Sequence, residues 1–221
     1  MVNTYQIYPR RRSYGNLSVN TKLILINIFI FLIVTLMIGS GILSLDYVAI
    51  KPASILQGEY LWTFFTSMFM HGNFFHIFVN MFSLFFIGGL VERILGKRRY
   101  LYFYLISGLC AGFFFVLLSL IFSADFNTFA VGASGALFGL IGLLMLITPN
   151  LSVYIMFIPI PIKMKYAAPG ILIVLWIVSY WADLPIGNTA HLGGLLCGLI
   201  YGIYLRKRYK NKIKYIGKHF S

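Results

Sequence analysis

The sequence has few charged residues and very few acidic ones. Lys, Arg, Asp and Glu make up 10% of its 221 residues, and the chain holds only five Asp and Glu. A typical soluble domain has about a quarter of its residues charged. Hydrophobic residues account for 60% of the chain. This composition excludes an ordinary soluble domain and indicates a protein whose surface contacts lipid.

Cysteine is also scarce. The two cysteines, Cys110 and Cys197, lie in separate apolar segments. In such a segment a cysteine packs as a small apolar side chain. We therefore expect two free thiols rather than a disulfide, and the pair says little about the redox compartment.

Long apolar segments are what the chain has in abundance. A helix needs about 20 mainly apolar residues to span a bilayer. Six segments qualify: 23–43, 73–91, 100–123, 132–148, 167–182 and 187–205. We predict an all-α membrane protein with a bundle of six transmembrane helices over residues 21–205. A polar tail of residues 1–20 precedes this domain, and a basic tail of residues 206–221 follows it.

Two further apolar segments are predicted to lie at the membrane surface. Residues 61–70 sit between the first two spans and contain Trp62, an aromatic residue of the kind that favours the headgroup level. Residues 151–162 are interrupted by Pro159 and Pro161. We expect the first segment to lie on the interface and the second to form an interfacial loop.

The net charge of +13 is concentrated on one side of the predicted bundle. With six spans that start inside, all of the 18 Lys and Arg except Lys51 fall in cytoplasmic segments, and four of the five acids fall outside. Cytoplasmic loops are enriched in Lys and Arg. We therefore expect both termini in the cytoplasm. The basic segments would face anionic lipid, so the expected partners include the bilayer and no nucleic acid.

Four polar residues inside the predicted spans fall at one depth. They are His76 and Asn80 in the second span, Ser134 in the fourth and His191 in the sixth. At about 1.5 Å per residue they lie about 18 to 24 Å from the cytoplasmic helix ends, in the outer part of a core about 30 Å thick. Ionisable residues in a membrane segment are costly and are functional by default. Their common depth predicts a single site.

These residue types suit nucleophilic catalysis. Ser134 has the hydroxyl of a nucleophile, and His191 has the imidazole of a general base. No Asp or Glu lies at this depth, so the pair would act as a dyad without the carboxylate of a triad. His76 and Asn80 share one helix face and would stabilise a developing oxyanion. Ala136 replaces the last glycine of G-x-S-x-G, which excludes an α/β-hydrolase elbow.

Glycines favour a close approach of the helices that carry the serine and the histidine. Gly194 and Gly198 form a G-x-x-x-G pattern directly after His191. Small residues at this spacing allow two membrane helices to pack tightly. We expect the sixth helix to pack on the fourth and to bring His191 to Ser134.

Together these motifs resemble those of the rhomboid family of intramembrane serine proteases. The matching residues are His71-x4-His76-x3-Asn80, Gly132-x-Ser134-Gly135 and Ala190-His191-x2-Gly194-x3-Gly198, over roughly residues 20–205. The resemblance implies a six-helix serine endopeptidase that cuts peptide bonds in or near transmembrane helices of client membrane proteins through an acyl-enzyme. It also implies client entry between the second and fifth helices, with the first loop and the loop near residues 181–183 as covers.

The resemblance implies roles for individual residues as well. Ser134 would be the nucleophile and His191 the general base. His76 and Asn80 would help to form the oxyanion hole. Gly132 would allow the strained approach of the chain to the serine.

Three other positions follow from the same resemblance. His71 would be structural and would tie the first loop to the site. Phe138 stands where many members have Tyr, and it would stack under His191 without adding a hydroxyl. Thr63 follows Trp62 where many members carry Arg, which leaves the anchoring of the first loop open.

Two alternatives stay open. One is a non-catalytic rhomboid-like protein that captures membrane helices. The other is a small transporter or a metal site built from His71, His76 and His191, but the chain shows no clear repeat, and Ile77 breaks the zinc-protease pattern H-E-x-x-H. We expect neither a metal nor a cofactor. A six-span chain without an extra helix or a transit peptide fits a prokaryotic inner membrane.

Overall fold

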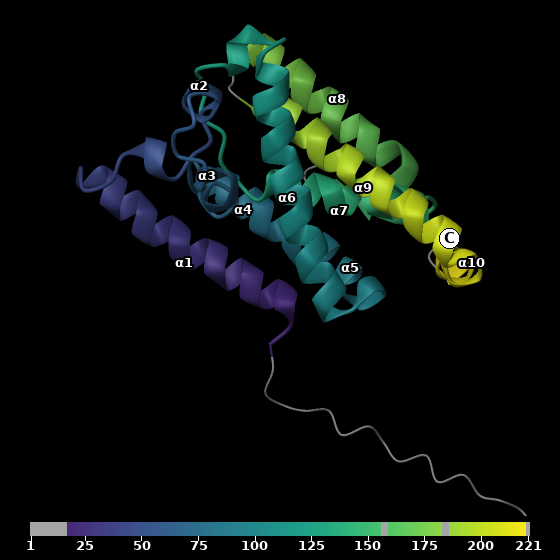
Figure 1. Cartoon of the computed structure of the whole chain (residues 1–221). Helices are drawn as coiled ribbons and strands as arrows, with labels where there is room; N and C mark the ends of the chain where they lie inside the picture. The colour runs from purple at the N-terminus through teal and green to yellow at the C-terminus, as the bar shows by residue number, and fades with distance from the viewer. Residues whose placement is uncertain (1–16, 156–158, 183–185, 220–221) are drawn as a thin grey trace, which may run out of the picture.

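The computed structural model of the chain describes residues 17–155, 159–182 and 186–219, and most of these residues are helical (Figure 1). The elements in chain order are α1 (Val19–Gly39), η1 (Leu45–Tyr47), α2 (Pro52–Leu56), α3 (Thr63–Thr66), α4 (Phe74–Ser83), the π-helical turn η2 (Leu84–Gly88), α5 (Gly89–Leu95), α6 (Lys97–Ser119), η3 (Ser123–Asp125), α7 (Ser134–Ile147), β1 (Ser152–Tyr154), β2 (Pro161–Lys163), α8 (Met164–Ala182), α9 (Asn188–Arg208) and α10 (Lys210–His219). Of the predicted tail at residues 1–20, only residues 17–20 lie in the described part.

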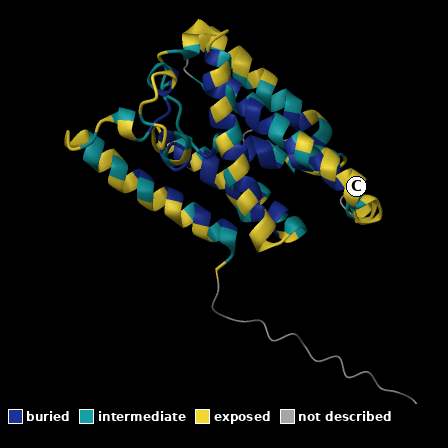
Figure 2. Cartoon of the chain, in the orientation of Figure 1, coloured by how far each residue is buried: buried dark blue, intermediate teal, exposed yellow. Residues whose placement is uncertain are grey.

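Helix α7 lies at the centre of the bundle. It packs most extensively against α9 and then against α6, with α8 on a further side. Ten of its 14 residues are buried, and Figure 2 shows the buried residues gathered in the middle of the bundle. Helix α1 runs along the edge and buries few of its apolar residues (Figures 1 and 2). Apolar residues therefore cover the outside of the bundle as well as its core, as lipid contact requires.

Helices occupy all six positions at which spans were predicted. Within the residues that the structure describes, four segments are long and apolar enough to cross a membrane: α1, the continuous helix Phe74–Leu95, α6 and α8. Helix α7 has 14 residues, which rise about 21 Å and so fall short of a hydrocarbon core of about 30 Å. Helix α9 has 21 residues, but its glycines, histidine and basic end make it less apolar. The six-span count stays a prediction.

The start of α1 is held by polar contacts to the helix Phe74–Leu95. The backbone N–H groups of Val19 and Asn20 donate to the two Glu92 carboxylate oxygens at 3.0 and 2.8 Å. A carboxylate at a helix N-terminus satisfies free N–H groups and complements the helix dipole. The Asn20 carboxamide donates to the Leu84 carbonyl in η2 and accepts from the Tyr100 hydroxyl at 2.6 Å. These contacts explain why α1 starts four residues before its predicted first residue.

The segment 151–162, predicted as a loop, contains most of an antiparallel β-hairpin. Strands β1 and β2 pair with Val153 opposite Ile162 and Tyr154 opposite Pro161. The prediction of a loop was wrong here because a proline at the first residue of a strand does not prevent pairing. Its place at the membrane surface stays a prediction.

The described residues of the predicted basic tail are mostly helical. Helix α9 continues to Arg208, three residues past the predicted end of the bundle, and α10 follows it. Tyr209 and Ile213 pack against the main hydrophobic core. The boundary of the membrane domain at residue 205 stays a prediction, and the basic segment after it contains an apolar stripe of helical spacing.

Backbone contact between α7 and α9 brings these two helices unusually close. A side-chain carbon on Gly194 would meet the carbonyl oxygen of Gly135, and one on Gly198 would meet that of Gly139. Close backbone contact of this kind is a main source of packing between membrane helices. The G-x-x-x-G pattern of α9 thus fits directly against the glycines of α7.

Gly198→Ala should destabilise the protein. The added methyl group would meet the Gly139 carbonyl oxygen and would lie 2.8 Å from the Leu143 nitrogen. Because both are backbone atoms, the helices would have to separate, and overpacking of this kind costs about 1–3 kcal/mol. The midpoint of unfolding in detergent, followed by circular dichroism, should therefore fall.

Gly170→Ala in α8 is the matched control. No neighbouring atom lies within 4 Å of the position that its methyl group would take. The midpoint of this variant should stay the same or rise slightly, because Ala favours a helix more than Gly. Equal losses in the two variants would contradict a special contact at Gly198.

Candidate active site

Ser134 and His191 form a hydrogen bond at the ends of two packed helices. Ser134 is the first residue of α7, and His191 lies in the first turn of α9. The distance from His191 Nε2 to Ser134 Oγ is 2.9 Å. Two of the four residues that sequence spacing placed at one depth are therefore in direct contact, 57 positions apart in the chain. A serine hydroxyl bonded to an imidazole nitrogen is the arrangement that activates a nucleophile.

The His191 ring is held by an aromatic ring rather than by a carboxylate. The Phe138 ring, one turn along α7 from Ser134, stacks on the imidazole with a centroid distance of 4.6 Å and an interplanar angle of 20°. Within the described part of the chain, no group bonds to the buried His191 Nδ1. The orientation of the His191 ring is thus fixed by packing on Phe138, where a triad has the carboxylate of an Asp.

Gly132, two residues before the serine, leaves the position between the Ser134 hydroxyl and the His76 ring free of a side chain. Its backbone has φ of +120°, a conformation that residues with side chains rarely adopt. A side-chain carbon at this position would lie 2.8 Å from His76 Nε2 and 3.7 Å from Ser134 Oγ. The space is therefore lined by the candidate nucleophile on one side and an imidazole nitrogen on the other.

His76 presents a hydrogen-bond donor to this space. The backbone N–H of Gly72 donates to His76 Nδ1 at 3.4 Å. A neutral imidazole that accepts at Nδ1 carries its proton on Nε2. The Nε2–H group thus lies at the edge of the space beside Gly132. An oxyanion bound there would be within the 2.7–3.1 Å range typical of such donors.

Asn80 lies one turn after His76 and contacts its backbone. The Asn80 side-chain Nδ2 donates to the His76 carbonyl oxygen at 2.8 Å. The side chain is buried, and its Oδ1 has no partner among the residues that the structure describes. Asn80 is therefore beside His76, as its spacing predicted, but its hydrogen bond is to the backbone of α4 rather than to Ser134.

His71 connects the first loop to the segment before the serine. Its side chain is fully buried, and the Ala133 N–H donates to its Nε2 at 3.4 Å. Burial, and to a smaller extent the nearby His76, lower the pKa of His71 to about 3. The ring therefore stays neutral at physiological pH and can accept this hydrogen bond.

Backbone contacts from the first loop also hold this segment, and the sequence carried no signal for them. The Gly132 N–H donates to the Ser67 carbonyl oxygen at 2.8 Å. Ile50 and Ala130 exchange two backbone hydrogen bonds of 2.8 and 3.0 Å. These bonds use no side chain, so residue types give no sign of them. The loop between the first two long helices is thus the support on which the chain approaches Ser134.

Aromatic contacts and a buried hydroxyl anchor the first loop itself. The Trp62 indole donates to the Tyr47 carbonyl oxygen at 3.0 Å, and the Tyr60 ring packs against both of these aromatic rings. The hydroxyl of the fully buried Thr63 donates to the Tyr60 carbonyl oxygen at 2.7 Å. These contacts anchor the first loop in this chain, which has Thr63 at the position where many family members carry Arg.

A family comparison matches most of the chain. The Rhomboid domain family matches residues 58–208, which include every residue of the site. The chain belongs to the rhomboid family. Together with its long apolar helices, this makes it an integral membrane protein of mainly helical structure.

Relatives of this rhomboid protein come from plants and bacteria. It is similar to RHOMBOID-like protein 1 of Arabidopsis thaliana, with 33% identity over 174 residues, which cover 75% of this chain and 40% of that protein. It is similar to Rhomboid protease GlpG of Salmonella paratyphi A, with 31% identity over 144 residues, which cover 63% and 46%. The comparison therefore does not support a prokaryotic inner membrane over another membrane.

The name of one relative shows that a protein can belong to the rhomboid family and still be called inactive. Inactive RHOMBOID-like protein 8 of Arabidopsis thaliana is 29% identical over 164 residues, which cover 72% of this chain and 43% of that protein. The chain spans less than half the length of each of these three curated relatives. Whether this rhomboid cleaves peptide bonds thus depends on its own residues.

Gly132→Ala should slow the reaction of Ser134 with a fluorophosphonate by a factor on the order of 10², the loss typical of one oxyanion donor. The methyl group would fill the space beside His76 Nε2, at a φ that strains any side chain. Labelling rates in detergent, measured by mass spectrometry, check this result.

Gly187→Ala is the matched control for this prediction. Gly187 has φ of −66°, and its methyl group would make only an ordinary contact of 3.8 Å with Ala190. Its labelling rate should match that of the wild type. If Gly132→Ala reacts as fast as this control, the space does not take part in the reaction.

Proposed function

We propose that this rhomboid protein is a serine endopeptidase that hydrolyses peptide bonds in or near transmembrane helices of client membrane proteins. The observation that carries the proposal is the 2.9 Å hydrogen bond between Ser134 Oγ and His191 Nε2. It lies inside an apolar bundle, where an ionisable group such as the His191 imidazole is costly and points to a functional site. Relatives named as rhomboid proteases support the same class of activity.

In the proposed mechanism Ser134 attacks the client carbonyl carbon while His191 Nε2 takes the hydroxyl proton. The His191 imidazolium then gives this proton to the leaving amine, and the C–N bond breaks to leave an acyl-enzyme on Ser134. Water attacks the ester with His191 again as base, which releases the acid product and restores the serine. The stack on Phe138 keeps Nε2 aimed at the hydroxyl during both steps.

The oxyanion of each tetrahedral intermediate would occupy the space beside Gly132. His76 Nε2–H would donate to it from one side, and Asn80 would assist. Since the Asn80 side chain bonds to the His76 carbonyl oxygen, part of its contribution would be to hold α4 and its histidine in place. Donors fixed before the reaction stabilise developing charge without reorganisation.

The proposal includes the membrane arrangement that the charge pattern predicted. The bundle of residues 21–205 would span six times with both ends in the cytoplasm, and α7 would be a short central span surrounded by the others. Clients would enter between the helix Phe74–Leu95 and α8, whose outer faces expose Phe78 and Trp176, among others. A client helix would have to unwind near its outer end, because peptide bonds in a helix are shielded. The proposed cover near residues 181–183 includes Asp183, which lies outside the described residues.

Ser134→Ala and His191→Ala should each abolish cleavage of a reporter transmembrane helix in membranes while the protein still inserts. Each variant removes one partner of the hydrogen bond. Ser40→Ala, a change at an exposed serine beyond the end of α1, is the matched control and should cleave at the wild-type rate. Immunoblots of the reporter check cleavage.

Wild-type cleavage by either dyad variant would contradict this assignment. A fluorophosphonate adduct on Ser134, located by mass spectrometry, would support it independently of the reporter. If the wild type neither cleaves the reporter nor reacts with the fluorophosphonate, the alternative of a non-catalytic rhomboid-like protein holds. The relative named as inactive is an example of such a protein in the family.

Asn80→Ala should lower kcat by a factor of about 10²–10³, the usual loss of one oxyanion-hole donor, with KM little changed. The variant also frees the His76 carbonyl oxygen from its side-chain partner. Asn80→Asp, which keeps the size but loses the N–H donors, should be equally slow. Turnover of a reporter in detergent measures both constants, and unchanged kinetics would remove Asn80 from the site.

A further inference from the structure

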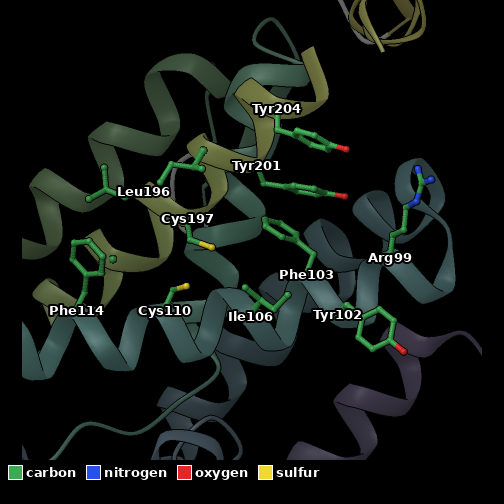
Figure 3. A pocket seen from close by; sticks show the side chains of 12 residues that line it. Arg99, Tyr102, Phe103, Ile106, Cys110, Phe114, Leu196, Cys197, Tyr201 and Tyr204 are labelled. Carbon is green, nitrogen blue, oxygen red and sulfur yellow. The ribbon is translucent and has the colours of Figure 1, made fainter. Parts of the chain in front are cut away.

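A groove runs between α6 and α9, on a different side of α9 from the serine–histidine pair. Its volume is about 540 Å³. Figure 3 shows Phe103, Ile106 and Phe114 of α6 on one wall and Leu196 of α9 on the other. Ile106 and Ile200 at its rim are 52% and 68% exposed. The groove is therefore an apolar channel that opens to the outside of the bundle.

The groove follows the length of the helices. Its α6 wall extends from Arg99 to Phe114, and 15 residues of helix rise about 22 Å. One leaflet of a hydrocarbon core about 30 Å thick is about 15 Å deep. The free thiols of Cys110 and Cys197, predicted as unpaired, line it from the two walls, Cys110 from α6 and Cys197 from α9 (Figure 3). The apolar wall is thus longer than one leaflet is deep, so an acyl chain of that leaflet would contact it along its whole length.

A polar pocket of about 290 Å³ continues the groove at its basic end. Arg99, Tyr201 and Tyr204 line both cavities, and Tyr209 lines the second. The Arg99 guanidinium lies 5.8 Å from the centre of the Tyr209 ring. Tyr201 and Tyr204 stack on each other, and Figure 3 shows their hydroxyls directed toward the side of Arg99. Among the described residues, no acid lines either cavity.

We propose that this groove binds an anionic phospholipid from the leaflet at the basic end of the bundle. One acyl chain lies between α6 and α9, and the phosphate lies beside Arg99. The guanidinium presents paired N–H donors that match phosphate oxygens, and the hydroxyls of Tyr201 and Tyr204 add donors. Basic pockets between membrane helices on this side of a bilayer bind anionic headgroups.

The size of the groove favours a lipid chain over a client helix. A helix about 10 Å wide along about 22 Å would take up roughly 1,700 Å³. The groove offers about 540 Å³, which suits a single extended hydrocarbon chain. The combination of a narrow apolar channel with a cationic end matches the two parts of a phospholipid.

A photoactivatable lipid tests the proposal. The full chain in detergent micelles is incubated with phosphatidylglycerol carrying a diazirine in its acyl chain, or with phosphatidylcholine carrying the same chain. After irradiation, mass spectrometry locates the adducts. Phosphatidylglycerol should label the facing residues of α6 and α9 about five-fold more than phosphatidylcholine, which is the effect expected of one basic residue near a membrane surface.

Variants separate the two parts of the site. Arg99→Gln should reduce labelling by phosphatidylglycerol to the level of phosphatidylcholine. Arg93→Gln, which removes the same charge from an exposed side chain of α5 that lines neither cavity, should leave the difference in place. Ile200→Trp should fill the groove at its exposed rim and reduce labelling by both lipids.

Three results would overturn the proposal: equal labelling of the wild type by the two lipids, equal effects of the two arginine variants, or adducts spread over other helices. If Arg99→Gln does not fold, the comparison of the two lipids on the wild type and on Ile200→Trp decides the question. A client transmembrane peptide that displaces the lipid adducts would also count against it, because the groove would then hold a helix.

Discussion

The backbone contact between α7 and α9 is the constraint on which the other features of this rhomboid depend. In a bilayer, apolar side chains gain little free energy when they exchange contact with lipid for contact with one another. Membrane helices are therefore held together by close packing and by polar contacts. Glycines on both helices allow carbonyl groups of α7 to lie against α9. Because Ser134 opens α7 and His191 lies in the first turn of α9, this contact also brings the two side chains together. One packing interaction thus supplies both stability and the candidate site.

The site is built from neutral groups that are positioned by packing. A buried carboxylate at this depth would carry a large desolvation cost unless it were paired. The stack of Phe138 on His191 and the neutral acceptor His71 avoid that cost. Glu92, which is the buried acid among the described residues, lies instead at the far end of its helix, where the N-terminus of α1 satisfies both of its oxygens. Charge is thereby kept at the ends of the bundle, and geometry does the orienting inside it.

The sequence allowed the polar side chains of the site to be predicted because each is costly in an apolar segment. Ser134, His191 and His76 could be placed at one depth by counting residues, and the structure brings them within contact distances of a common space. Contacts made by backbone groups could not be predicted, since the Ser67 carbonyl and the bridge from Ile50 require no particular residue type. Helix α10 was missed for a related reason, because its lysines dominate its composition.

The shortness of α7 has a consequence for where water can reach the site. With 14 residues, this helix stops well inside the bundle, and the space below it is closed by other parts of the chain. Leu151 and Val153 of the hairpin region and Tyr209 and Ile213 at the C-terminal end pack against the same core as the last turns of α7. This layer forms a hydrophobic floor. In the proposed mechanism, water for hydrolysis would therefore reach the dyad from the end of the bundle opposite the basic one, and its access would be one-sided.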